Sequence, residues 1–136
     1  MVPVFLLTFM ILDVSMVIFI RCTFQNAVRD GVRYAITGAN SPGPGQDDSI
    51  KALVKKDALG FLNGKESTMH VHWIDPSSGA VANNSMGNIV EVSVEAYTHS
   101  PLAPYLRLGF PVNIWARAYD VMQFVPGTLP PITHLE

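Results

Sequence analysis

The chain has few of the residues that would connect it to a disulfide-stabilised, nucleic-acid-binding or catalytic class of protein. Its 136 residues include a single cysteine, Cys22, so no disulfide can form within the chain. Charged residues make up only 15% of the sequence and the net charge is −2, which argues against nucleic acid as a partner. No glycine-rich phosphate loop follows an expected strand, and no serine lies in a nucleophile elbow. The sequence therefore predicts a protein that is not an enzyme.

Basic residues are absent from the first 20 positions, where an apolar run contains a single charge, Asp13. A cleaved secretory signal would need a basic start and a small-residue cleavage site, and this run has neither. No proline or glycine interrupts the chain between Val4 and Gly31. The sequence therefore predicts one helix over about 4–37, roughly 50 Å long, which exceeds a bilayer core of about 30 Å. We expect its first part to span a membrane.

The second part of this expected helix has two chemically different faces. Apolar or small residues recur at the spacing of one helix face, at Phe24, Ala27, Val28, Gly31, Val32 and Ala35. The opposite face is polar, with Gln25, Asn26, Arg29, Asp30 and Arg33. Glycine inside a helix costs about 1 kcal/mol relative to alanine. We expect Gly31 to permit close approach of a strand through its small residues Ala116 and Ala118.

The remaining sequence predicts a small α+β domain. A cluster of glycine and proline over 38–46 ends the first helix and forms a linker. A short amphipathic helix follows, with Asp47, Asp48 or Ser49 as its N-cap and an end near Gly64. Alternating segments at 68–74, 88–97 and 112–118 predict three strands, most simply an antiparallel meander packed on the first helix.

The predicted organisation is therefore an α+β chain with three parts. A long membrane-spanning helix and its amphipathic stalk occupy 1–37. A domain with a second short helix and a three-stranded antiparallel sheet occupies 38–125, and a flexible, proline-containing tail occupies 126–136. In the middle strand the alternation places Val90, Val92, Val94 and Ala96 on one face, with Tyr97 on the other.

His70 and His72 are the candidate metal ligands, because alternation places both on one face of the first strand. A zinc site would need further ligands, for which His99 or Glu91 are the available guesses. Exposed strand histidines without a ligand are the default, so we predict no metal and no other cofactor.

The stretch TFQNAVRDGVRYA, from Thr23 to Ala35, resembles the signature of the TadE-like minor pseudopilins of tight-adherence (Flp-type) pilus systems. In that family an apolar helix with one acidic residue leads into a Gln-Asn-Ala, acidic-Gly, Arg-Tyr-Ala run, and Asp13 stands where that acidic residue is found. A valine-alternating strand, a loop rich in proline and leucine and a strand ending in Ala116-Arg117-Ala118 are similar to the family's C-terminal half.

The resemblance implies a pilin-like domain held outside the cytoplasm by a single span of the bacterial inner membrane. It implies a role in assembling or priming a Flp-type pilus. The expected partners are membrane lipid, other pilin or pseudopilin subunits and the inner-membrane assembly platform. The residues expected to mediate assembly and helix packing are Asp13, Phe24, Gln25, Asn26, Arg29, Gly31, Arg33 and Tyr34.

Two features conflict with a simple reading of this resemblance. Arg21, Arg29 and Arg33 follow the apolar run, and by the positive-inside rule alone they would keep the domain in the cytoplasm. The basic leader and early glutamate of the family are not present, so we expect the natural N-terminus to lie further upstream. The alternative is a membrane-anchored extracytoplasmic binding domain unrelated to pili, with His70 and His72 as its candidate metal ligands.

Asp13 is the strongest single functional candidate. An acidic group at mid-bilayer costs roughly 2.5–3.5 kcal/mol on insertion scales. Arg21 lies about two turns away, whereas helix side chains pair at i+3 or i+4. We therefore expect the partner of Asp13 to come from a neighbouring chain, the assembly platform or a terminal amine, unless the carboxyl group stays protonated.

Overall fold

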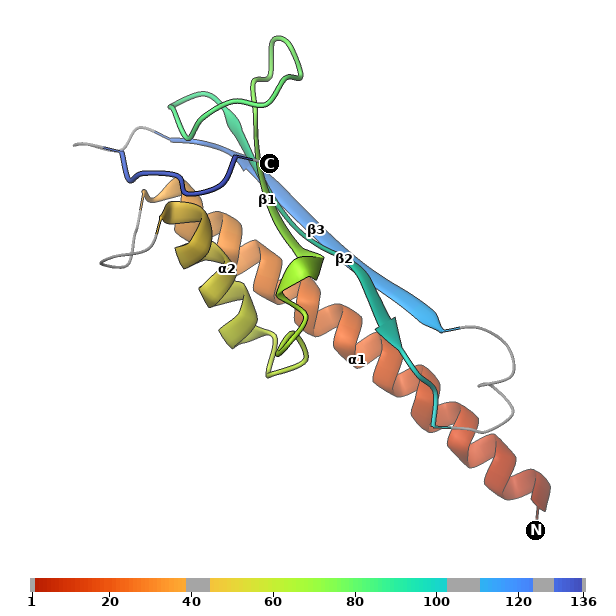
Figure 1. The fold of residues 1–136 in the computed structure, drawn as a ribbon. Coiled ribbons are helices and arrows are strands. Elements are labelled where there is room, and N and C mark those ends of the chain that lie inside the picture. The colour runs from red at the N-terminus through yellow and green to blue at the C-terminus, as the bar shows by residue number, and fades with distance from the viewer. Residues whose placement is uncertain (1, 39–44, 103–110, 124–128, 136) are drawn as a thin grey trace.

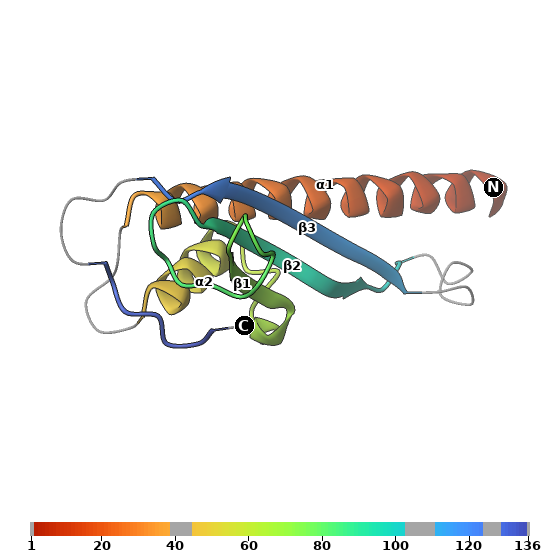
Figure 2. The ribbon, with the colours of Figure 1, turned by 90° about the horizontal axis from the view of Figure 1, so that it is seen from above.

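The first helix dominates the structure, a computed structural model that describes residues 2–38, 45–102, 111–123 and 129–135. Helix α1 runs without interruption over Val2–Ile36, as the sequence predicted. Its N-terminal turns project beyond the ends of the strands (Figures 1 and 2). Most of the expected linker, at 39–44, lies outside the described residues.

The second helix begins slightly earlier than expected and ends earlier too. Helix α2 covers Gln46–Asp57, and turns continue the chain to Gly64 before the 3-10 helix η1 at Glu66–Thr68. The expected capping by Asp47, Asp48 or Ser49 is wrong, because Gly45 occupies the N-cap position and no side chain caps the helix. The Ser49 hydroxyl donates to the Gly45 carbonyl instead, at 2.9 Å.

The sheet is the predicted three-stranded antiparallel meander, in the order β1-β2-β3. Its strands are β1 (Met69–Ile74), β2 (Ile89–His99) and β3 (Val112–Val121). Both helices lie on the same side of the sheet, as Figure 1 shows, and α1 runs alongside β3 (Figure 2). The α+β fold class is confirmed.

A β-bulge in β2 breaks the alternation that the sequence indicated. Val94 pairs with Ala116, but the next pair is Tyr97 with Ile114, so β2 contains one extra residue at this point. Ala96 takes the positive φ of 55° and is exposed, whereas Tyr97 is buried. The expected positions of Ala96 and Tyr97 are therefore wrong, because the inserted residue reverses the faces of the strand after Glu95.

The bulge serves the core by delivering an aromatic ring to α1. The rings of Tyr97 and Phe24 meet edge to face with centroids 4.8 Å apart, a geometry worth about 0.5–1.5 kcal/mol beyond the buried area. Trp73, Ile20, Ile50 and Leu62 are also fully buried between the helices and the sheet. The C-terminal half of α1 is therefore part of the hydrophobic core that it shares with α2 and the sheet.

Residues 131–134, within the range 126–136 where the sequence predicted a loose tail, are hydrogen-bonded to the start of α2. Both carboxylate oxygens of Asp47 accept backbone N–H bonds, at 2.7 Å from Thr133 and 2.9 Å from His134. The Gln46 N–H donates to the Pro131 carbonyl at 2.8 Å. Asp47 is fully buried, so these bonds compensate the cost of removing its carboxylate from water. Residues 124–128 and 136 lie outside the described residues.

Candidate functional site

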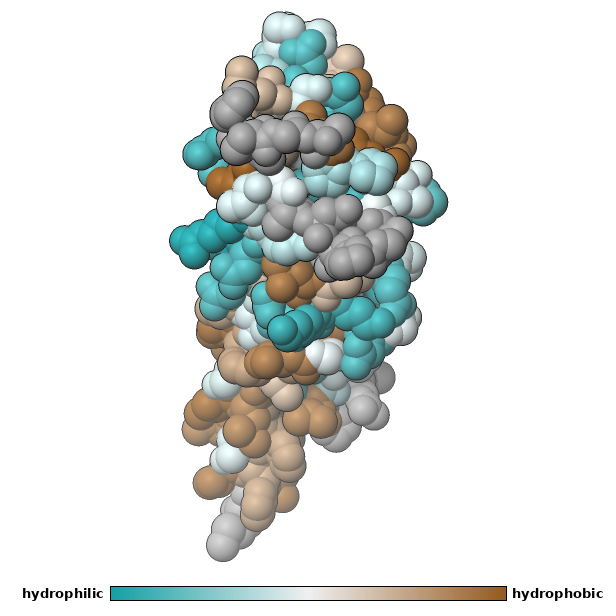
Figure 3. Space-filling model, turned by 90° about the vertical axis from the view of Figure 1, so that its left-hand side faces the viewer, coloured by the Kyte–Doolittle hydropathy of each residue, from teal (hydrophilic) through white to brown (hydrophobic). Residues whose placement is uncertain are grey.

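The N-terminal half of α1 exposes apolar side chains on most of its surface. The exposed fractions run from 38% for Met16 to 69% for Val2. The exposed side chains are Val2, Val4, Phe5, Leu6, Leu7, Phe9, Met10, Ile11, Leu12, Val14, Met16, Ile18 and Phe19. Figure 3 shows this end of the molecule as an almost continuous hydrophobic surface. Within the described ranges α1 is the helix long and apolar enough to cross a membrane. Only 11% of an apolar 18-residue stretch of this helix is buried.

One stripe of α1 is covered by the protein's own domain, and that stripe begins at Asp13. From there Val17, Ile20 and Phe24 follow at intervals of three or four residues, and Val17 is partly buried while the others are buried. This is the spacing of a single helix face. The domain therefore contacts α1 along one face well into the apolar half, while the other faces of the same turns stay exposed.

Asp13 has a partner in its own chain. Its carboxylate oxygen Oδ1 accepts the backbone N–H of Leu102 at 2.7 Å, and the residue is only 3% exposed. Leu102 follows β2, whose antiparallel course beside α1 carries the chain back to this level. The expectation that the partner must come from another chain or a terminal amine is wrong. It failed because local helix spacing carries no information about a contact 89 residues away.

Gly31 lies on the buried side of the motif, next to α2 rather than β3. A Cβ atom at Gly31 would lie 2.8 Å from Val54 Cγ2 and 3.4 Å from both Ile50 Cγ2 and Val92 Cγ1. The expected close approach by Ala116 and Ala118 is therefore wrong. Glycine at this position allows the two helices to pack closely, which is the physical reason for a residue that costs helix stability.

The arrangement consists of an apolar helix with one acidic residue followed by a motif that is half buried and half exposed. Residues 1–33 match the model of the TadE-like protein family. The match confirms the resemblance over the segment that carries Asp13 and most of the motif, and it relates the chain to the proteins of Tad pilus systems. No curated protein and no solved structure showed significant similarity to the chain.

Within the TadE-like segment, the buried and exposed candidates have different roles in the fold. Phe24 and Gly31 are buried in the domain core. Gln25 is half-buried, and its Nε2 donates to the Arg117 carbonyl at 3.0 Å, which occupies an acceptor on the edge strand β3. These side chains hold α1 against its own domain, and in this fold their contacts are within the chain.

The exposed candidates form one polar strip on α1. Asn26, Arg29, Asp30 and Arg33 surround a shallow hollow of about 290 Å³. Arg33 and Asp30 approach to 3.8 Å, but the side chain of Arg33 remains 80% exposed. Such an exposed pair contributes little to stability. These groups are therefore available to a partner. We call them the polar strip.

Tyr34, just beyond the matched residues, is half-buried at the junction of α1 and α2. It lines a second shallow hollow with Ser49, Ala52, Leu53 and Lys56. Its position continues the accessible surface from the polar strip towards α2.

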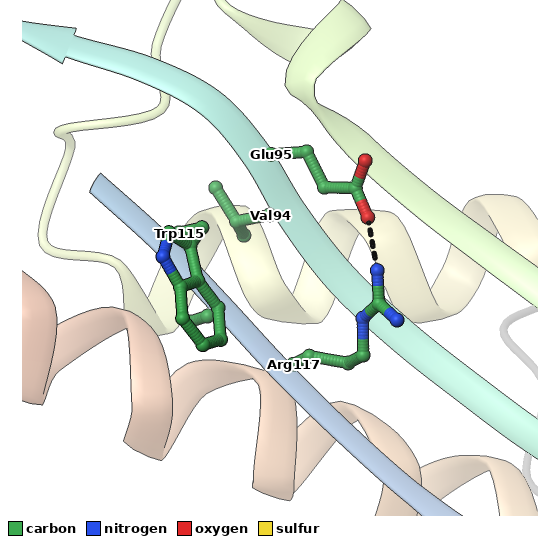
Figure 4. A pocket seen from close by; sticks show the side chains of 5 residues that line it. Val94, Glu95, Trp115 and Arg117 are labelled. Carbon is green, nitrogen blue, oxygen red and sulfur yellow. Dashed lines mark hydrogen bonds and ion pairs between the residues drawn. The ribbon is translucent and has the colours of Figure 1, made fainter. Parts of the chain in front are cut away.

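The outer face of the sheet carries an ion-pair cluster centred on Arg117. Its Nη2 lies 2.8 Å from Glu95 Oε1 (Figure 4). Its Nε lies 3.4 Å from Glu91 Oε1. The hydrogen bond from Arg117 lowers the pKa of Glu95, and the same bond raises the pKa of Arg117. The lowered pKa of Glu95 gives a contribution to stability that is present above its ordinary pKa and is lost as the pH falls through the folded-state value.

Two contacts between the apolar helix and the sheet or the residues that follow it were not predicted from the sequence. One is the Leu102 N–H bonded to Asp13. The other joins Arg21 to the exposed Trp115 of β3, whose ring centroid lies 5.4 Å from the guanidinium carbon. The length of β2 was the signal that could have predicted them. A strand of 11 residues that runs back along the helix extends roughly 35 Å and so reaches its apolar half.

We expect His70→Ala and His72→Ala to leave both stability and metal content unchanged. The two rings stack with centroids 5.9 Å apart, and within the described ranges no group of three or more potential metal ligands gathers around them. Half-exposed polar residues on a sheet face contribute little to folding. Metal analysis of protein purified without added metal, with thermal melting of both variants, would check this. Stoichiometric zinc that disappears in the double variant would show that a site exists.

Proposed function

We propose that the chain is a minor pseudopilin, a membrane-anchored and non-enzymatic subunit that acts in the assembly of a tight-adherence (Flp-type) pilus. The observation that carries this proposal is the TadE-like match on a helix whose N-terminal half exposes apolar side chains on most of its surface. That half suits packing among lipid tails and other pilin helices. The folded domain covers one stripe of the helix and leaves the polar strip accessible.

The polar strip is the proposed contact with other subunits or with the assembly platform. Arg29 and Arg33 are exposed there, beside the amide of Asn26 and the carboxylate of Asp30. Arginine is suited to such contacts because its planar guanidinium can form paired hydrogen bonds with a carboxylate. Since α1 continues directly from the membrane into this strip, a helix packed beside α1 in the bilayer would meet these groups just outside it.

Deletion of the gene is expected to remove surface pili, and the wild-type gene supplied in trans is expected to restore them. Electron microscopy of the two strains measures this directly. A deletion strain that still displays wild-type numbers of pili would contradict the proposal. It would then favour the alternative of an anchored extracytoplasmic binding domain with no part in pili.

Charge reversal in the polar strip should separate assembly from folding. We expect Arg29→Glu with Arg33→Glu to keep the wild-type melting temperature and yet to reduce piliation strongly, because like charges placed together at an interface cost several kcal/mol. Lys51→Glu on α2, outside the residues that line the hollow beside Tyr34, is a matched control, and it should support normal piliation. Equal piliation by the strip variant and the wild type would rule out the strip as the contact.

The domain is proposed to lie outside the cytoplasm, with α1 crossing the inner membrane once. A reporter enzyme that works only in the cytoplasm should therefore be inactive when fused after Glu136. A reporter that works only outside should be active at the same position. The reverse pattern would agree with the positive-inside rule applied to Arg21, Arg29 and Arg33, and it would refute the proposed topology.

A further inference from the structure

The end of the β2–β3 hairpin lies beside the apolar half of α1. We call the described residues at this end, Thr98–Leu102 with Val112 and Asn113, the hairpin tip. The tip is fixed at the level of Asp13 by the 2.7 Å hydrogen bond from the Leu102 N–H. Arg21 lies two helical turns further along α1, about 12 Å towards the domain. The folded domain therefore reaches well past the first basic residue.

At this same level the other faces of α1 present apolar side chains to the surroundings. Val14 is 50% exposed and Ile18 is 57% exposed, on the faces away from the stripe that begins at Asp13. If α1 is inserted in a membrane, as proposed above, these side chains require lipid. The hairpin tip and the lipid then occupy the same depth on different sides of one helix.

We propose that the hairpin tip passes through the headgroup layer of the bilayer and reaches the first part of the acyl chains, with the Arg21–Trp115 pair binding lipid headgroups at the water-facing boundary of that layer. This placement rests on the proposed membrane insertion of α1. It identifies a lipid-binding surface on the folded domain, in addition to the apolar helix.

Two independent lengths agree on the thickness of the immersed region. Along α1, Asp13 and Arg21 are separated by about 12 Å. Along β3, Val112 and Trp115 are separated by about 10 Å. The headgroup layer is roughly 5–8 Å thick on each side of the hydrocarbon core. When the Arg21–Trp115 pair lies at the water-facing boundary, the tip therefore lies about 2–7 Å below the start of the acyl chains.

The chemistry of the pair suits this boundary. Trp115 is 59% exposed and its ring lies against the Arg21 guanidinium, 5.4 Å from its central carbon. Tryptophan concentrates at membrane interfaces because its ring is largely apolar but carries one N–H donor. The guanidinium fork of arginine matches the oxygens of a lipid phosphate. At the tip, Leu102 has a side chain that suits acyl chains, while its backbone N–H is already bonded to Asp13, as a low-dielectric environment requires.

The two tryptophans of the chain provide a test with an internal control. Trp73→Phe leaves Trp115 as the only reporter, and Trp115→Phe leaves the fully buried Trp73. Among the described residues, the Trp73 indole N–H has no hydrogen-bond partner, so phenylalanine preserves the aromatic core there. Each full-length variant would be reconstituted into vesicles of phosphatidylcholine and phosphatidylglycerol. The phosphatidylcholine would carry bromine near the headgroup end of its acyl chains, and flotation would establish insertion.

We expect bromine to cause a loss of Trp115 fluorescence and to leave Trp73 fluorescence unchanged. Quenching of Trp115 by aqueous iodide but not by brominated lipid, in vesicles that carry the protein, would overturn the immersion while leaving the membrane anchor intact. Quenching by neither agent would mean that a neighbouring subunit covers Trp115, which also overturns it. A chain that does not float with the vesicles would refute the proposed membrane insertion itself.

Discussion

Asp13→Leu is expected to insert into the membrane at least as well as the wild type and to fail in pilus assembly. The substitution removes an acidic group that is costly in an apolar span. It also removes the acceptor of the Leu102 N–H bond, and a hydrogen bond to a charged group is worth about 1.5–3 kcal/mol. We therefore expect a lower melting temperature, because the hairpin tip would separate from α1.

Asp13→Asn and Asp13→Glu distinguish between two reasons for such a defect. Both keep an oxygen that can accept the Leu102 N–H, but only glutamate keeps the charge. If docking of the tip is what matters, both should restore piliation. If the charge itself meets a cation on a neighbouring subunit, only glutamate should do so. Normal piliation and melting of Asp13→Leu would show that the residue is merely tolerated in the span.

Gly31→Leu is expected to destabilise the domain more than any other change considered for this chain. Even the first atom of a side chain would lie 2.8 Å from Val54 Cγ2, so α1 and α2 would have to move apart. Overpacking of this kind costs typically 1–3 kcal/mol and occasionally more. A leucine side chain, with three further carbons in a fully packed site, should reach the upper end of that range.

Alanine at two positions of the same helix provides the matched comparison for this prediction. Gly31→Ala should lower the melting temperature despite the roughly 1 kcal/mol that alanine gains over glycine in a helix. Asn26→Ala, on the exposed polar strip, should leave it unchanged or slightly raised. If Gly31→Ala and Asn26→Ala melt alike, close packing between α1 and α2 is not the reason for glycine at position 31.

The sequence was sufficient to predict the elements of the fold because each has a strong local pattern. The uninterrupted apolar run predicted α1, and the alternation of valines with polar residues predicted β2 up to Glu95. The pattern failed at the next residue. A bulge depends on how two strands fit against α1, which brought Tyr97 rather than Ala96 to the core.

The two faces of the candidate site could be predicted from the sequence, but its contacts could not. The motif separated the apolar face of α1 from its polar face, and the structure places those faces in the core and at the surface as expected. The contacts of Asp13 with Leu102, of Gly31 with Val54 and of Asp47 with Thr133 all depend on the tertiary arrangement. No local spacing rule encodes them, because each joins elements that are distant in the sequence.

The docking of the chain's last described residues on α2 also determines when the domain can close during synthesis. Asp47 is made 86 residues before Thr133 supplies the first of its backbone donors. At about 5–20 residues per second, this carboxylate remains without those donors for roughly 4–17 s. A charged carboxylate favours water over burial during that interval, so the start of α2 cannot settle into its final place. The domain therefore completes its core only after most of the chain has been made.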